Sequence, residues 1–210
     1  MIRILVADDH TLVREGLKQI LSDLPDMAVT DEASNGKEVL DKINESDFDV
    51  VLLDISMPGQ NGLDILKQIK LLKPELPVLI LSMHPEEQYA IRTLRAGAAG
   101  YLTKESAPDE LIEALRKVSL GKKYITFSLA EKLAYDWDAG TKKLLHERLT
   151  DREYQVMCMI ASGKTVSQIA REISLSVKTV STHRAHIMKK MKMINNAELT
   201  HYAIKHGLVD

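Results

Sequence analysis

Two periods of hydrophobic residues alternate along the first 120 residues of the chain. Short apolar runs occur near residues 2–7, 27–32, 49–54, 77–82 and 98–103. Between these runs, apolar residues such as Leu12, Leu17 and Leu21 recur at spacings that place them on one face of a helix. Strands that alternate with helices in this way predict a parallel sheet covered on both faces. The uninterrupted apolar runs at 50–53 and 78–81 are typical of strands buried on both sides.

A different pattern begins after this region. Residues 121–147 are polar and mixed, which predicts a linker with a short helix at 128–134 and irregular chain at 136–140. From residue 148 every segment has a helical pattern, with a capping box at Thr150 and Glu153 and a helix end at Gly163. Four helices are expected here, and a short turn at 174–176 joins two of them as a helix-turn-helix. We therefore expect an α/β domain at 1–120, a linker at 121–147 and an all-α domain at 148–210.

Charge separates the same regions. The net charge is −2, but residues 1–120 hold 13 basic and 21 acidic residues, whereas residues 148–210 hold 10 basic and 5 acidic residues. An acidic first domain and a basic second domain indicate different partners. The basic domain suits a polyanion, although basic residues are also common on solvated helix surfaces.

Composition narrows the cellular setting. The sequence has no apolar run near the roughly 20 residues that span a bilayer, so no membrane partner is expected. Its first residues form a strand pattern rather than a signal peptide. Cys158 is the only cysteine, which excludes an intrachain disulfide, and its apolar neighbours favour a buried residue over a reactive thiol. These features predict a cytoplasmic protein.

Polar residues mark the ends of four expected strands. Asp8 and Asp9 follow the first strand, Asp54 ends the third, Ser82 ends the fourth and Lys104 follows the fifth. The carboxyl ends of parallel strands converge on one crevice, so we expect these side chains to meet. Three crowded carboxylates raise one another's pKa, and Mg2+ would relieve the repulsion. Singly, the paired aspartates also fit a helix cap and the lysine a surface cation, but their joint placement favours a site.

This combination fits transient phosphorylation of a carboxylate. An aspartate can act as a nucleophile toward phosphorus, and Asp54 is the natural acceptor because it ends a central strand. We expect Asp9, Asp54 and the main-chain carbonyl of Ser56 to bind Mg2+ directly, with Asp8 acting through water.

The remaining polar groups predict a switch. Lys104 would balance the charge of the phosphoryl group, and the hydroxyl of Ser82 would donate a hydrogen bond to it. Movement of Ser82 would vacate space into which Tyr101 can turn, which gives a two-state element biased by a modification.

Four motifs in this region resemble those of the receiver domain of two-component response regulators. They are ADDH at 7–10, LDISMPG at 53–59, LS at 81–82 and YLTK at 101–104. The resemblance covers residues 1–120 and implies a flavodoxin-like (βα)5 fold. It also implies that Asp54 receives a phosphoryl group from a sensor histidine kinase in the presence of Mg2+, followed by slow self-dephosphorylation. In that family the residues at the positions of Ser56 and His84 tune this rate; for His84 a solvated loop histidine is the alternative.

The basic domain contains a helix suited to duplex DNA. One face of the helix at 177–191 is mainly apolar, with Val177, Val180, His183, Ile187 and Met191. Short polar and basic side chains on the opposite face suit a DNA major groove. That face holds Lys178, Ser181, Thr182, Ala185 and Lys189.

Further residues are candidates for phosphate contacts. On this helix they are Thr179, Arg184, Lys189, Lys190 and Lys192, and at the start of the preceding helix they are Lys164, Thr165 and Ser167. The alternative for the lysine cluster is a solvated helix end that compensates the helix dipole.

This region resembles the C-terminal helix-turn-helix domain of NarL/FixJ (LuxR-type) regulators. The motifs are LTDRE at 149–153, GK at 163–164, IA at 169–170 and VKTVSTH at 177–183. Two departures are Asp151 where proline is usual, and the lack of a frequent asparagine near Ser167. Family members bind DNA as dimers, often through the last helix, which implies a homodimer here that uses Leu199, Tyr202 and Ile204.

The sequence thus predicts a phosphorylation-controlled, DNA-binding transcription regulator with no enzymatic activity beyond its own phosphorylation and dephosphorylation. One alternative is a Mg2+-dependent phosphohydrolase, but haloacid dehalogenase-type enzymes carry a second acid where this chain has Ser56. Another alternative is a phosphorylation-independent DNA-binding regulator with a vestigial receiver, against which the complete set of acids argues.

Overall fold

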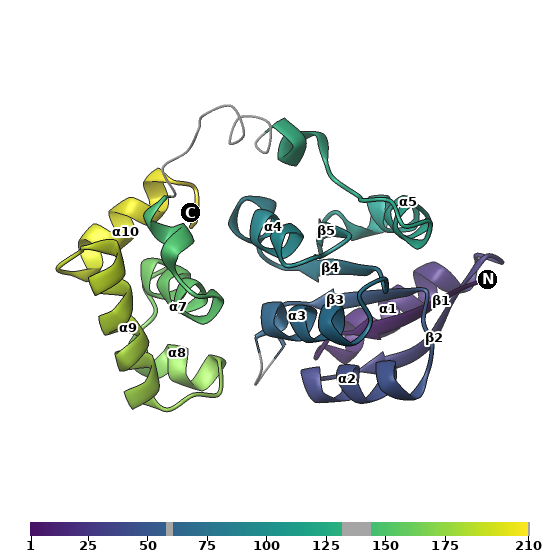
Figure 1. Cartoon of the computed structure of the whole chain (residues 1–210), viewed down its shortest axis with the longest axis horizontal. Coiled ribbons are helices and arrows are strands. Elements are labelled where there is room, and N and C mark those ends of the chain that lie inside the picture. The colour runs from purple at the N-terminus through teal and green to yellow at the C-terminus, as the bar shows by residue number, and fades with distance from the viewer. Residues whose placement is uncertain (58–60, 132–143, 210) are drawn as a thin grey trace. The chain divides into compact units, whose positions relative to one another are not determined.

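The computed structural model describes residues 1–57, 61–131 and 144–209 (Figure 1). The chain forms two compact units, unit 1 (Met1–Ala130) and unit 2 (Glu131–Asp210). Residues 127–131 are helical, as expected for the start of the short helix at 128–134. The rest of that helix, the irregular stretch at 136–140 and part of the motif at 53–59 lie outside the described residues.

A five-stranded parallel sheet forms the centre of unit 1. Its strands are β1 (Ile2–Ala7), β2 (Met27–Ala33), β3 (Val50–Asp54), β4 (Val78–Ser82) and β5 (Gly100–Thr103). They are arranged in the order β2-β1-β3-β4-β5, which is that of flavodoxin-like folds. The residues of β3 and β4 are buried throughout, as their continuous apolar pattern predicted.

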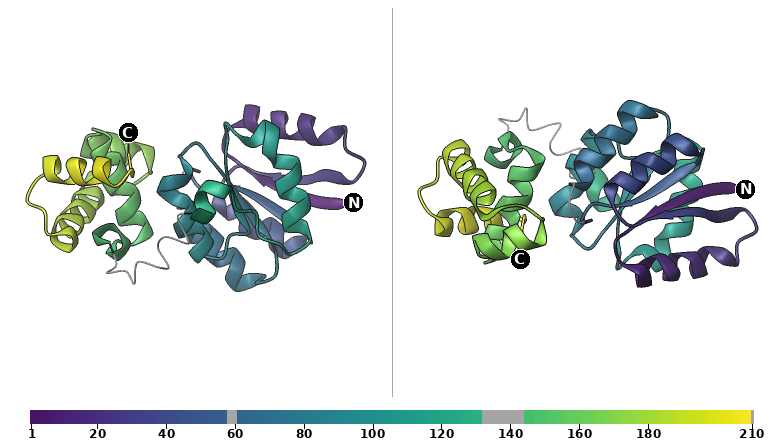
Figure 2. Two further views of the ribbon diagram at one scale, coloured as in Figure 1. Left: turned by 90° about the horizontal axis from the view of Figure 1, so that it is seen from above. Right: turned by 90° about the horizontal axis from the view of Figure 1, so that it is seen from below.

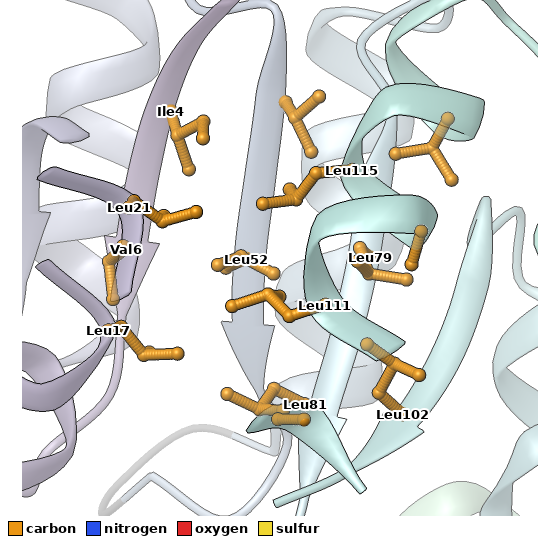
Figure 3. Packing of buried hydrophobic residues seen from close by; sticks show 14 of the residues in the cluster. Ile4, Val6, Leu17, Leu21, Leu52, Leu79, Leu81, Leu102, Leu111 and Leu115 are labelled. Carbon is orange, nitrogen blue, oxygen red and sulfur yellow. The ribbon is translucent and has the colours of Figure 1, made fainter. Parts of the chain in front are cut away.

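Helices connect successive strands and cover both faces of the sheet (Figures 1 and 2). They are α1 (Thr11–Ser22), α2 (Gly36–Glu45), α3 (Gly62–Leu72), α4 (Glu86–Arg95) and α5 (Ala107–Ser119). On one face, Leu17 and Leu21 of α1 and Leu111 and Leu115 of α5 pack against leucines of the strands such as Leu52 (Figure 3). Truncation of a leucine this deeply buried typically costs about 2–5 kcal/mol of stability.

The register of the strands fixes where the polar residues lie. Ala7 pairs with Leu53, Asp54 with Leu81, and Ser82 with Thr103. The four strands β1, β3, β4 and β5 therefore end at the same edge of the sheet. Residues at or just after their carboxyl ends face a common crevice.

The chain returns to the sheet after α5. In this return segment (residues 122–131), the N–H of Tyr124 donates to the carbonyl of Ala99, with an N···O distance of 2.8 Å, and Tyr124 forms a parallel bridge with Gly100. A Cβ atom on Gly100 would lie 2.7 Å from the carbonyl oxygen of Tyr124. Glycine at position 100 is therefore what allows the return segment to approach β5.

The described residues of unit 2 form helices joined by short turns. A 3-10 turn, η1 (Leu145–Arg148), precedes α7 (Asp151–Ala161), α8 (Val166–Glu172), α9 (Val177–Met191) and α10 (Asn196–Lys205). Thr150 and Glu153 form the predicted capping box of α7, and Gly163 follows that helix with a φ of 84°. The predicted order of an α/β fold followed by an all-α fold with a helix-turn-helix is confirmed. The 3-10 turn η1 was not predicted from the sequence.

Within the described ranges, none of the helices combines the length and the apolar character that a bilayer crossing requires.

Candidate functional site

Three aspartates meet at the carboxyl edge of the sheet in unit 1. Asp8 follows β1 and Asp54 ends β3; each is only 1% exposed, and Asp9 is partly buried beside them. One potential ligand atom from each aspartate, and one from His10, lie within 4.8 Å of one another. The three aspartates therefore lie together at this edge, as predicted from the strand ends.

Lys104 connects two of these aspartates. Its Nζ atom lies 2.7 Å from Oδ2 of Asp54 and 2.6 Å from Oδ2 of Asp8. Burial alone would lower the pKa of the Lys104 ammonium, but its contacts with Asp54 and Asp8 outweigh burial and raise that pKa. Lys104 is thus a permanently charged counterion of the site, and it is not a solvated surface lysine.

Asp54 is a buried carboxylate that is held by a cation and by a main-chain donor. Burial raises the pKa of its carboxyl group, although Lys104 and the N–H of Ser56 oppose the shift. The N–H of Ser56 donates to Oδ1 of Asp54 over 2.8 Å, so a main-chain donor and a cation both hold the carboxylate. Ser56 itself is exposed, and its carbonyl as a metal ligand stays a prediction.

The donor set fits a hard divalent cation. Oδ1 of Asp9 is buried and accepts no well-aligned hydrogen bond, although Nδ1 of His10 lies 2.9 Å away. Carboxylate oxygens in close proximity are the ligands that small divalent cations prefer. The cluster can therefore hold a metal ion.

Two neighbours of the acids, one of them the histidine of the ADDH motif, had no role assigned from the sequence. His10 reaches Asp9 and, at 3.2 Å, Oδ1 of Asp8, while its own side chain stays 64% exposed. Arg14 donates from Nη1 to the main-chain carbonyl of Asp8 over 2.7 Å, and from Nε to Glu32 over 3.0 Å. Arg14 lies one helical turn into α1, a position at which a basic residue has no special sequence signal.

The two predicted switch residues, Ser82 and Tyr101, both form hydrogen bonds with the main chain of His84. Ser82 is fully buried, and its Oγ accepts a hydrogen bond from the N–H of His84 over 3.1 Å. The hydroxyl of Tyr101 donates to the carbonyl of His84 over 2.8 Å. Tyr101 is 1% exposed, and burial raises its pKa. The phenol of Tyr101 thus already lies inside the protein, which is the position into which it was expected to turn.

The predicted DNA-contacting residues lie at the surface of unit 2. Arg184 is half-buried and the others are exposed: Lys164, Thr165, Ser167, Lys178, Thr179, Ser181, Thr182, Ala185 and Lys189. On the opposite side of α9, Val180, Ile187 and Met191 are buried as expected. Val177 is 51% exposed, so the apolar face is shorter than predicted.

Several of these side chains already have partners within unit 2. Lys164 pairs with Glu172 at 2.7 Å, and Nε of Arg184 donates to Asn196 over 2.9 Å. The hydroxyl of Thr165 caps α8, as an N-cap residue commonly does. These contacts fix the geometry of the surface, and each must loosen or be shared if its side chain also contacts a phosphate.

Two residues have structural positions that correct the sequence interpretation. Nζ of Lys190 lies 2.6 Å from Oε2 of the buried Glu153, so Lys190 holds α9 on α7 rather than standing free for a phosphate. Leu199 is fully buried against α7 in the core of unit 2, so its side chain is not available to a second chain. Ile204 is 53% exposed and Tyr202 is half-buried, and both remain accessible on α10.

Comparison with known proteins decides the family. Residues 4–116 match the family model described as response regulator receiver domain, and residues 147–203 match the one described as bacterial regulatory proteins, luxR family. The chain is a response regulator of the luxR family. The predicted membership of the NarL/FixJ type is confirmed. This response regulator combines a receiver domain with a LuxR-type DNA-binding domain, which makes it a transcription regulator of that family.

Relatives match this response regulator over nearly its whole length. The response regulator UvrY of Escherichia coli strain K12 is 38% identical over 209 residues, which cover 99% of this chain and 96% of the relative. The response regulator GacA of Pseudomonas protegens is 37% identical over 210 residues, which cover 100% and 99%. Both parts of the chain are therefore found together, in the same order, in these relatives.

Solved structures give the same result. RcsB from Salmonella enterica serovar Typhimurium, bound to promoter rprA in the presence of the phosphomimetic BeF3-, is 27% identical with a TM-score of 0.65; the match covers 96% of this chain and 98% of that chain. A LuxR-family response regulator from Aurantimonas is 31% identical with a TM-score of 0.61, over 65% of this chain and 98% of the other.

Proposed function

We propose that Asp54 is the phosphoryl acceptor of this response regulator and that a sensor histidine kinase is the donor. A carboxylate oxygen of Asp54 attacks phosphorus, a P–O bond forms, and the P–N bond to the histidine of the kinase breaks. The observation that carries the proposal is the pairing of buried Asp54 with Lys104 at 2.7 Å. That ammonium is already in place to balance the added charge, and phosphoryl transfer depends mainly on such positioning and neutralisation.

Mg2+ is the proposed cofactor of the same site. Asp9, Asp54 and the carbonyl of Ser56 would hold it, and Asp8 would act through water. When bound, the cation neutralises developing charge on the phosphoryl oxygens. Two features support this assignment: the aspartates approach within 4.8 Å of one another, and one buried oxygen of Asp9 has no aligned hydrogen bond.

Ser82 and Tyr101 are the proposed readout of the acceptor. The Ser82 hydroxyl would donate a hydrogen bond to the phosphoryl group. Tyr101 would occupy the space that Ser82 vacates. Both residues already bind His84 from opposite directions, through its N–H and its carbonyl. A displacement of either residue therefore has to alter the loop that contains His84.

Unit 2 is proposed to bind double-stranded DNA through α9. Its exposed face would enter the major groove, with Lys178, Ser181, Thr182 and Ala185 toward the bases. The remaining candidates would contact phosphates: Lys164, Thr165, Ser167, Thr179, Arg184 and Lys189. A homodimer on DNA, with Tyr202 and Ile204 of α10 at its interface, completes the proposal. One structural neighbour consists of two RcsB dimers bound to two parallel DNAs, which supports this arrangement.

The proposed domain limits are 1–120 for the receiver, 121–147 for the linker and 148–210 for the DNA-binding domain. The proposed location is the cytoplasm, where both DNA and the transmitter part of a kinase are accessible. No activity on other substrates is proposed. The only nucleophile that we assign is Asp54, which is itself the residue that becomes phosphorylated. The competing proposal is a vestigial receiver whose DNA binding ignores Asp54.

The test is incubation of the full chain with acetyl phosphate, with and without Mg2+, followed by intact mass measurement. We expect a gain of one phosphoryl group that requires Mg2+ and is absent from Asp54→Ala. A gain that survives in Asp54→Ala would assign the acceptor to another residue. If Asp54→Ala leaves the DNA affinity and its response to donor unchanged, the vestigial receiver is the correct description.

A further inference from the structure

The return segment is firmly built into unit 1. Tyr124 is only 8% exposed and its hydroxyl donates to Glu110 of α5 over 2.7 Å. Leu129, five residues further on, is 1% exposed. Together with the close approach of Tyr124 to Gly100, these contacts anchor the segment beside β5 and α5. The described part of the connection, up to residue 131, is therefore attached to the receiver at a defined place.

Thr126 caps the helix that begins at residue 127. Its Oγ1 accepts a hydrogen bond from the N–H of Leu129 over 3.2 Å, in the manner of an N-cap side chain. The same hydroxyl lies 2.7 Å and 2.8 Å from the two carboxylate oxygens of Glu86, to which it donates. One side chain thus connects the first turn of α4 to the start of the helix at 127–131.

Glu86 follows directly after the loop that contains His84. That loop is held at His84 by Ser82, whose Oγ accepts from its N–H, and by Tyr101, which donates to its carbonyl. Both hydrogen bonds come from the proposed readout residues. A hollow of about 310 Å³ flanks the loop, lined by Met83, Pro85, Glu86, Glu87, Thr103 and Glu105. The loop therefore has open space on one side.

We propose that the Thr126–Glu86 contact transmits the state of the acceptor site to the chain that connects the two units. The proposal rests on the proposed function of Asp54. While Tyr101 is buried, it holds the carbonyl of His84, so that Glu86 stays in reach of Thr126. When Tyr101 turns outward, this hydrogen bond breaks, Glu86 withdraws and the helix at 127–131 loses its cap. Phosphorylation favours the buried position of Tyr101. It therefore stabilises the Thr126–Glu86 contact and the start of the helix at 127–131.

Amide hydrogen exchange of the full chain tests this coupling. Exchange would be followed in the peptide that covers residues 124–131, with and without acetyl phosphate and Mg2+, on samples whose phosphoryl content is measured by intact mass. In the wild-type protein we expect exchange at Leu129 to slow by about fivefold on phosphorylation, the factor that corresponds to a typical helix cap. In Thr126→Val it should be fast in both states, and Thr126→Ser should restore the response.

A second pair of variants separates the coupling from misfolding. Glu86→Ala should abolish the response as Thr126→Val does, whereas Glu87→Ala, with the same change of charge one residue further on, should retain it. Phosphorylated wild-type protein with unchanged or faster exchange at Leu129 would overturn this coupling and leave the function of Asp54 intact. A normal response in Thr126→Val would overturn it as well. Wild-type protein that takes up no phosphoryl group would overturn the proposed function and this coupling with it.

Discussion

The ammonium of Lys104 lies between two buried carboxylates, 2.7 Å from Oδ2 of Asp54 and 2.6 Å from Oδ2 of Asp8. The Lys104 side chain is 9% exposed and both acids are 1% exposed, so water screens these charges little. A buried ion pair of this kind is costly to break, because removal of one partner leaves an uncompensated charge in a medium of low polarisability.

Lys104→Met should therefore destabilise unit 1 by about 3–5 kcal/mol in buffer without divalent cations. Because Mg2+ would take over part of the neutralisation, millimolar Mg2+ should recover part of this loss. The measurement is the free energy of unfolding of unit 1 from urea titration, with and without Mg2+. A matched control is Lys18→Met, since Lys18 pairs with Glu15 and Glu32 at the surface. The control should change stability much less and show no rescue by Mg2+; equal effects of both variants would contradict the argument.

Gly100→Ala should destabilise the protein because its Cβ would lie 2.7 Å from the carbonyl oxygen and 2.9 Å from the Cβ of Tyr124. Overpacking of this kind costs roughly 1–3 kcal/mol. Thermal unfolding of the full chain measures the loss. Gly16→Ala in α1 is the control, because nothing lies within 4 Å of its added Cβ. There alanine should stabilise the helix by up to about 1 kcal/mol, so the two substitutions should shift the unfolding temperature in opposite directions.

The Glu153–Lys190 pair should make the stability of unit 2 depend on pH. Burial by itself would raise the pKa of Glu153, but Lys190 and Thr150 outweigh burial and hold that pKa below its ordinary value of 4.5. A carboxylate with a depressed pKa in the folded state contributes stability fully above its unfolded pKa, and loses it as the pH falls through the folded value. Unit 2 should therefore weaken below about pH 4.5.

Lys190→Met should remove most of this pH dependence and cost about 1–3 kcal/mol at neutral pH, because it leaves a buried acceptor without its cation. The readout is the urea midpoint of NMR signals from α7 and α9 at pH 7 and pH 3.5. Lys164→Met, which removes the more exposed pair with Glu172, is the control and should leave the pH dependence in place. A wild-type midpoint that does not change with pH would count against the role given to Glu153.

Salt should weaken DNA binding in proportion to the number of phosphates contacted. The slope of log affinity against log salt is about −0.9 for each phosphate neutralised on duplex DNA. Lys189→Ala should weaken binding to a mixed-sequence duplex and reduce the slope by about 1, because Lys189 is proposed to contact a phosphate. Lys122→Ala, the same charge change on unit 1, should leave the slope unchanged. A flat salt response of the wild-type chain would exclude binding through these cations.

Most of the fold followed from local pattern. The strands β3 and β4 are apolar throughout, and the Thr150–Glu153 capping box fixes the start of α7 by itself. The meeting of Asp8 and Asp54 was also predictable, because parallel strands that end at one edge leave little choice. These features depend on short segments and on one rule of topology.

The features that were missed depend on pairs far apart in the sequence. Lys190 and Glu153 are separated by 37 residues, and Thr126 and Glu86 by 40. A lysine that ends a helix and a threonine before one have the same local pattern whether or not they find a distant partner. The position of the Tyr101 side chain also depends on a residue distant in the sequence, because its hydroxyl donates to the carbonyl of His84, 17 residues earlier.

The strand order has a consequence for the time at which the acceptor site comes into being. The strand β1 lies between β2 and β3 in the sheet. It is synthesised first, so it can pair on both sides only after β2 and β3 have been synthesised. Lys104, which pairs with Asp54, is synthesised 50 residues after it. Pairing of this non-local kind forms slowly, whereas helices with local contacts form early. An unfinished nascent chain that ends before residue 104 contains Asp54 but not Lys104, so the proposed acceptor site is complete only after the fifth strand has been made.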